Sequence, residues 1–183
     1  MDHKKNLLII DDEIEVLNTL KRVFYEEYNV HVTQNAKEAF EIMEKFNIKV
    51  ILCDQQMPDM KGTEFFIIVK DMYPSVIRIL FTGYSDLSDA IKSINEGQIF
   101  RYLAKPWNLF ELKSSVKEAF EKNALICENA NMVETLKNTN IILRDKVRMR
   151  TAELQVKNVE LERINNDKSR ILGIVAHDLR SPI

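Results

Sequence analysis

Glycine and proline are scarce in this chain of 183 residues, with four of each. Between Pro106 and Pro182 there is one glycine, Gly173, and no proline, so nothing in the sequence interrupts a helix there. A helix from Asn108 to about Ser181 would be ~110 Å long at the usual rise per residue. A globular core of this size cannot bury such a length, so we expect the helix to need a partner along most of it.

Three further absences restrict the class of protein. The two cysteines, Cys53 and Cys127, lie far apart and outside any CxxC or histidine cluster, which argues against a disulfide framework and a zinc site. No apolar run approaches the length of a membrane span, and the N-terminus has no signal-peptide core. The net charge is only -2, so neither nucleic acid nor a membrane is predicted as a partner. We therefore expect a cytoplasmic protein.

Aromatic residues are also missing from the last third of the chain, because every Phe, Tyr and Trp lies at or before Phe120. Beyond that point the sequence is aliphatic, charged and amide-rich, which is typical of helix alone. The first part instead alternates short apolar runs with amphipathic segments. The sequence therefore predicts a globular domain over residues 1–121, followed by the long helix.

The alternation within the globular part predicts an α/β fold. Five strands, separated by helices, imply a doubly wound parallel sheet with right-handed crossovers. Helix N-caps are predicted at Asp12, at Asn35 with Glu38 in a capping box, and at Asn108 with Glu111, while Gly97 is predicted to end the helix over 86–96. The predicted strands are 5–10, 29–33, 48–54, 76–82 and 99–106.

Polar side chains follow four of these strands at the edge where ligands of such sheets bind. Carboxylates that converge there would repel unless a cation lay among them, and oxygen ligands suit Mg²⁺. A lysine and a hydroxyl match the needs of a phosphoryl dianion, and a carboxylate is a competent nucleophile towards phosphorus. The alternative is that the acids only cap a helix and the lysine is a surface charge, but their common position favours a Mg²⁺-dependent aspartyl-phosphate site. The residues are Asp11, Asp12, Asp54, Thr82 and Lys105.

The stretches LLIIDDE, ILCDQQMPDMKG, ILFTGYS and YLAKPW resemble a response-regulator receiver domain, and the resemblance covers residues 1 to about 121. It implies a flavodoxin-like sheet of strand order 2-1-3-4-5, with Asp54 as phosphoacceptor. By the same resemblance Mg²⁺ is held by Asp11, Asp12, Asp54 and the backbone carbonyl of Gln56. Thr82 would hydrogen-bond the phosphoryl group, and Lys105 would pair with it.

Four positions acquire further roles only through this resemblance. Tyr102 matches the family's rotating aromatic switch, and Pro106 fits a peptide bond that is usually cis. Gln56 and Tyr84 stand where the family varies in ways that tune phosphate lifetime. Their effects would oppose each other, since Tyr84 could shield the acyl phosphate while Gln56 could orient a water.

The long helix carries an uninterrupted heptad pattern from 126 to 175 that predicts a left-handed coiled coil. Asn140 at an a position favours a parallel homodimer, whereas charges at the seam weaken the C-terminal half. A solitary surface helix is the alternative, although nothing else in the chain could cover its stripe. The a positions are Ile126, Val133, Asn140, Val147, Leu154, Leu161, Lys168 and Val175, and the d positions are Asn129, Leu136, Leu143, Arg150, Lys157, Ile164 and Ile171.

The sequence KSRILGIVAHDLRSPI resembles the opening of the dimerisation and phosphoacceptor domain of histidine kinases. This implies a coiled-coil linker over 122–168 and the start of that domain over 169–183. By resemblance His177 is the phosphoacceptor and Asp178 is its general base. Ser181 stands where that family often has a Thr or Asn that positions a water for phosphatase chemistry. ATP would be bound by a further domain, so we expect these residues alone not to phosphorylate His177.

Together these features predict a hybrid histidine kinase in which phosphorylation of Asp54 sets, through the coil, the output of a kinase that uses His177. Its expected partners are a cognate histidine kinase or phosphotransfer protein and a downstream response regulator. Two alternatives remain open. One is a response regulator whose coiled coil binds other proteins, with His177 incidental. The other is a degenerate receiver that serves only to dimerise.

Overall fold

The computed structural model describes residues 4–83 and 99–178, and it describes side chains as far as Leu172. The helix predicted over 86–96, with Gly97, and the positions of Tyr84 and Ser181 fall outside these ranges. The chain forms two compact units, residues 1–130 and 131–183.

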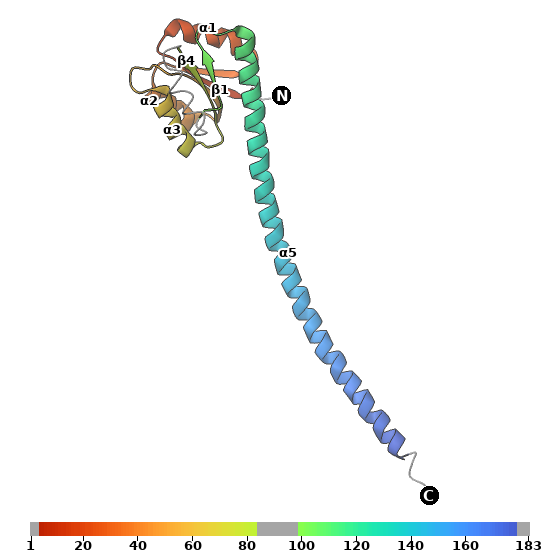
Figure 1. Ribbon diagram of the computed structural model, residues 1–183. Helices are drawn as coiled ribbons and strands as arrows, with labels where there is room; N and C mark the ends of the chain where they lie inside the picture. Colours follow the sequence, from red (N-terminus) through yellow and green to blue (C-terminus); the bar gives the residue numbers. More distant parts are fainter. Residues whose placement is uncertain (1–3, 84–98, 179–183) are drawn as a thin grey trace. The chain divides into compact units, whose positions relative to one another are not determined.

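The first unit is built on a five-stranded sheet of order β2-β1-β3-β4-β5, in which every neighbouring pair is parallel. This confirms the predicted flavodoxin-like sheet and its strand order. Figure 1 shows strands of this sheet together with helices around them. β5 is shorter than predicted. The strands are β1 (Asn6–Ile10), β2 (Asn29–Thr33), β3 (Ile48–Asp54), β4 (Ile77–Thr82) and β5 (Arg101–Ala104). The described helices are α1 (Ile14–Phe24), α2 (Ala36–Lys45), α3 (Gly62–Met72) and α5 (Leu109–Asp178).

Successive side chains of each strand point to opposite faces of the sheet, and helices cover both faces. In β1, Leu7 and Ile9 pack with residues of α1 and the start of α5. Leu8 and Ile10 pack instead with residues of α2 and α3. The central strands are mainly apolar for this reason, and their carboxyl ends lie at one edge of the sheet.

The helix caps confirm Asn108 and Asn35 as cap residues, and for Glu111 the structure shows only its N–H donating to Asn108 Oδ1 at 3.4 Å. They correct the capping box predicted at Glu38 and the cap predicted at Asp12. Asn108 accepts from Phe110 N at 2.8 Å, and α5 begins at the next residue, as predicted. Asn35 accepts from Glu38 N at 2.8 Å, but the Glu38 carboxylate accepts from the Thr33 hydroxyl instead of closing the capping box.

The predicted cap at Asp12 is wrong. The residue before α1 is Glu13, whose N–H donates to Asp11 Oδ1 at 3.0 Å. Asp11 thus binds the amide of the residue that precedes the helix, and Glu13 itself makes no side-chain cap hydrogen bond. The side chain of Asp12 is left exposed at the end of β1, free for another role.

The first turns of α5 are anchored in the first unit. Phe120 is buried and stacks on Tyr28 with ring centroids 4.4 Å apart. Asn123 is 4% exposed and donates to Ser75 O at 2.7 Å. Packing continues as far as Ile126, which lies partly buried against the core. The start of α5 is therefore fixed by both apolar and polar contacts.

In the second unit every described side chain from 131 to 172 is exposed in the single chain. The exposed residues include seam positions such as Leu136 at 56%, Leu143 at 51% and Leu154 at 61%. Isolated aliphatic side chains on a surface are ordinary, but a stripe at heptad spacing is a packing surface. None of the described helices has the length and apolarity that crossing a membrane requires.

Candidate functional site

The sequence-predicted polar residues gather at the carboxyl edge of the sheet. Asp11 follows β1, Asp54 ends β3, Thr82 ends β4 and Lys105 follows β5. Because these strands are neighbours in the order β1-β3-β4-β5, their ends lie side by side. The fold therefore assembles in space what the sequence separates by up to 94 residues, the spacing between Lys105 and Asp11.

Three carboxylates form the acidic half of the site. One oxygen from each of Asp11, Asp12 and Asp54 lies within 4.8 Å of the others. Asp11 is 0% and Asp54 6% exposed, whereas Asp12 faces solvent. Buried like charges at such separations raise the free energy of the folded state unless a cation balances them.

Lys105 supplies part of that balance. Its Nζ lies 2.9 Å from Asp11 Oδ2 and 2.9 Å from Asp54 Oδ1. Burial lowers the pKa of Lys105, but hydrogen bonds and charge from the two carboxylates outweigh burial and raise its pKa overall. Lys105 is therefore positively charged here, and its ammonium group bridges the carboxylates of Asp11 and Asp54.

The Asp54 carboxylate has separate partners for its two oxygens. Oδ1 accepts from Lys105, and Oδ2 accepts from Gln56 N at 3.3 Å. Burial raises the pKa of Asp54, the charge of Asp11 raises it further, and Lys105 and the Gln56 N–H offset part of the rise. Burial and the charge of Asp11 thus favour the neutral form of the Asp54 carboxyl, while Lys105 favours its ionised form.

The Thr82 hydroxyl is fully buried but does not reach the carboxylates. It donates to Gly83 O at 3.0 Å, and the Thr82 carbonyl accepts from Lys105 N at 2.9 Å. Tyr102 is partly buried against the α2–α3 side of the sheet. The Lys105–Pro106 peptide bond is cis, as the resemblance implied.

Two residues of the site escaped the sequence reasoning. The Trp107 ring stacks on Phe81 at 4.7 Å and lies 6.0 Å from Lys105 Nζ, beside an open hollow of about 390 Å³. Gly62 opens α3 where an added Cβ would lie 2.2 Å from Asp54 O. The motif YLAKPW could have indicated Trp107 by its adjacency to Lys105, whereas the close approach at Gly62 has no local signal.

The donor set fits a hard divalent cation. Carboxylate oxygens without cysteine or histidine are the ligands that Mg²⁺ prefers, and Mg²⁺ commonly takes few protein ligands. Asp11 and Asp54 are held by Lys105, while Asp12 is exposed and available. A cation at this site would therefore compete with Lys105 for two of its three carboxylates.

His177 and Asp178 lie in the last turns of α5, and their side chains fall outside the described part of the chain. Cys53 and Cys127 are both free, as the sequence predicted.

Comparison with known proteins bears on the first unit. Residues 7–117 match the model of the response regulator receiver domain. The hydrogenase transcriptional regulatory protein HoxA of Cupriavidus necator is 32% identical over 154 residues, which are 84% of this chain and 32% of HoxA. This chain thus spans about a third of that relative.

Two solved structures resemble the same unit. An adenylate cyclase structure from Rhodopirellula baltica is 30% identical with a TM-score of 0.69, and the match covers 72% of this chain and 98% of that one. A receiver domain protein from Clostridium thermocellum is 28% identical with a TM-score of 0.63, covering 67% and 98%.

Proposed function

Since the chain belongs to the response regulator receiver family, we propose that Asp54 accepts a phosphoryl group and that α5 carries the resulting change to an output. The observation that supports this best is Lys105 bridging Asp11 and Asp54 at 2.9 Å each. A carboxylate that could act as nucleophile, a second acid and a side-chain cation thus meet at one edge of the sheet, which supports the proposal. The phosphodonor is a histidine kinase or a phosphotransfer protein.

In the proposed reaction an Asp54 carboxylate oxygen attacks the phosphorus of a phosphohistidine. An O–P bond forms as the N–P bond of the donor breaks, and the imidazole nitrogen keeps the electron pair and takes a proton. Mg²⁺ held by Asp11, Asp12, Asp54 and the Gln56 carbonyl would neutralise charge on the phosphoryl oxygens. Lys105 leaves its carboxylate partner to pair with a phosphoryl oxygen, and the Thr82 hydroxyl turns from Gly83 O to another.

The change at Thr82 and Lys105 is well placed to reach α5. Both residues belong to the ends of β4 and β5, and α5 begins four residues after Lys105. Tyr102, on β5, is the proposed switch between the two states. Gln56 and Tyr84 are the proposed tuning positions for phosphate lifetime.

For the output we propose a cytoplasmic hybrid histidine kinase with a parallel homodimeric coil. The receiver spans 1–121, the coil 122–168, and the phosphoacceptor segment 169–183, with His177 as acceptor and Asp178 as general base. The exposed heptad stripe supports the coil, and the motif around His177 supports the kinase. ATP would be bound by another domain, and the phosphoryl group would pass on to a downstream response regulator.

A second candidate is a response regulator whose coil binds other proteins, with His177 incidental. It is favoured by the name of HoxA, a transcriptional regulatory protein, whose match covers 84% of this chain and so extends beyond the receiver. In this case the phosphorylated receiver would control the binding of a protein to α5.

The His177→Gln variant separates the two candidates. In the complete protein supplied with radiolabelled ATP, we expect an acid-labile, base-stable label that His177→Gln reduces to background. The control is His31→Gln, because His31 is a histidine of the receiver, on β2, that the proposal gives no role. Label that survives His177→Gln unchanged would exclude His177 as phosphoacceptor and favour the second candidate.

Magnesium binding is testable through Trp107, the only tryptophan of the chain. Binding draws Asp11 and Asp54 away from Lys105, so we expect Mg²⁺ to change Trp107 fluorescence. Asp12→Asn should weaken Mg²⁺ affinity about tenfold or more because a ligand charge is lost. Asp59→Asn, an exposed acid of the same loop region, should leave the titration unchanged. Equal Mg²⁺ affinity in Asp12→Asn and wild type would remove Asp12 from the metal site.

A further inference from the structure

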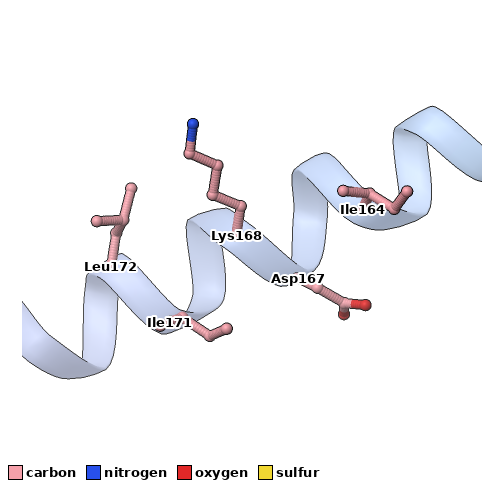
Figure 2. Close-up of a pocket in the computed structure, with 5 residues that line it drawn as sticks. All are labelled: Ile164, Asp167, Lys168, Ile171 and Leu172. Carbon is pink, nitrogen blue, oxygen red and sulfur yellow. The ribbon is translucent and has the colours of Figure 1, made fainter.

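A hollow on α5 has the residue spacing of a coiled-coil packing site. It has a volume of about 360 Å³ and is lined by Ile164, Asp167, Lys168, Ile171 and Leu172. Figure 2 shows these side chains along two turns of the helix. The first four lie at i, i+3, i+4 and i+7, the diamond that surrounds a side chain inserted from a facing helix. In the heptad assignment these four residues occupy positions d, g, a and d. In a parallel coiled coil, a set of four residues at these positions receives an a-position side chain of the facing helix.

The apolar corners of this diamond face outward in the single chain. Ile164 is 57% and Ile171 61% exposed. They flank Lys168, the a-position residue of the same layer. A facing helix would therefore bury two isoleucines only by also placing its own Lys168 in the hollow.

The two charged corners, Asp167 and Lys168, are opposite in sign but turned apart. Figure 2 shows their side chains extending from different sides of the helix. Over the described residues neither forms an ion pair within the chain. Elsewhere on the seam the situation differs, because Glu153 pairs with both d-position cations, at 2.7 Å to Arg150 and 3.3 Å to Lys157. Lys168 is thus a seam cation whose balancing charge must come from another helix.

We propose that a second copy of this chain docks here, parallel and in register, with its Lys168 in the hollow and paired with Asp167. The inference rests on the proposed homodimeric coil and adds the contact that fixes its register. A two-fold axis makes the contact reciprocal, so each chain supplies one Lys168 and one Asp167. In an antiparallel pair Lys168 no longer meets this layer. After a slip of one heptad only one of the two Lys168 side chains meets an acid, Glu160 at the preceding g position, and the other loses its partner. The seam cation therefore selects one arrangement by penalising the others.

Charge exchange in the full chain tests the proposal. Asp167→Lys leaves only lysines at the two positions, and Lys168→Asp leaves only aspartates. We expect each variant to self-associate about tenfold more weakly than wild type, since two attractive pairs become repulsive. An equimolar mixture should form heterodimers of wild-type strength, because the lysines of one chain then meet the aspartates of the other. Sedimentation equilibrium at low salt measures all three constants.

The matched control is the exchange of Glu162 and Arg163, an adjacent acid and base at the outer b and c positions. Glu162→Lys and Arg163→Asp should associate as wild type does, alone or mixed. If the two test variants dimerise like wild type and show no preference for mixing, the Asp167–Lys168 contact is overturned while the coil stands. A wild-type chain that remains monomeric at all concentrations would instead overturn the proposed coil and this contact with it.

Discussion

Asp54→Asn is expected to abolish covalent phosphorylation of the receiver. The amide that replaces the carboxylate is not a nucleophile towards phosphorus, so no acyl phosphate forms. With acetyl phosphate and Mg²⁺, the wild-type chain should gain one phosphoryl group by intact-mass measurement, and the variant none. Rate loss should reach the limit of detection, because the substitution removes the atom that makes the bond. The variant should still fold, since Asn keeps the size of Asp and its side-chain oxygen can accept from Lys105.

The matched control is Asp59→Asn, which changes an exposed carboxylate near the site and should be phosphorylated like wild type. Loss of the gained mass in hydroxylamine would identify the product as an acyl phosphate. If Asp54→Asn were still phosphorylated under these conditions, another acid would be the acceptor. If neither protein were phosphorylated, and beryllofluoride with Mg²⁺ also left Trp107 fluorescence unchanged, the site would be that of a degenerate receiver.

Gly62→Ala is expected to produce a large loss of stability for so small a change. The added methyl carbon would lie 2.2 Å from Asp54 O and 2.9 Å from Leu80 Cδ1. The first contact is with backbone at the end of β3, which cannot rotate away as a side chain can. Alanine gains up to ~1 kcal/mol over glycine from helix propensity. The strain should exceed that gain and reduce the free energy of unfolding by about 3 kcal/mol.

Urea unfolding followed by Trp107 fluorescence measures this loss, because that partly buried ring packs against the receiver core. Ile67→Ala in the same helix is the control: Ile67 is 46% exposed, so its truncation should cost about 1 kcal/mol or less. An unchanged midpoint for Gly62→Ala would show that α3 can move away from Asp54 at little cost. In that event the carboxylate is held less rigidly than the sheet edge suggests.

The sheet and the acid cluster were predictable because both follow from local patterns. Short apolar runs that end at Asp11 and Asp54 predict strands with an acid at the carboxyl end. Parallel pairing then brings the carboxyl ends of these strands together. Lys105 joined the cluster for the same reason. The distances between these side chains could not be predicted from the sequence. The equal distances from Lys105 to Asp11 and Asp54 depend on the register of β5 against β4.

Features that depend on tertiary packing were missed or misassigned. In α3 the run FFIIV is apolar on all sides, so periodicity could not show that Phe65, Phe66 and Val69 are buried while Ile67 and Ile68 are exposed. Adjacent acids at 11 and 12 could not be told apart, which is why the cap was assigned to Asp12. Gly62 gave no signal because the group it approaches lies on another element.

The bridge from Lys105 to Asp11 and Asp54 means that the folded domain carries its own counter-ion. The domain should therefore fold without a divalent cation. Mg²⁺ that binds the folded site should raise the unfolding midpoint, and a chelator should remove only that increment. An ion that enters must displace an internal one, so metal occupancy is coupled to the position of a side chain beside the start of α5. The Lys105 bridge would thus let the receiver fold without the ion, so that a cation and a phosphodonor would meet a site that is already ordered.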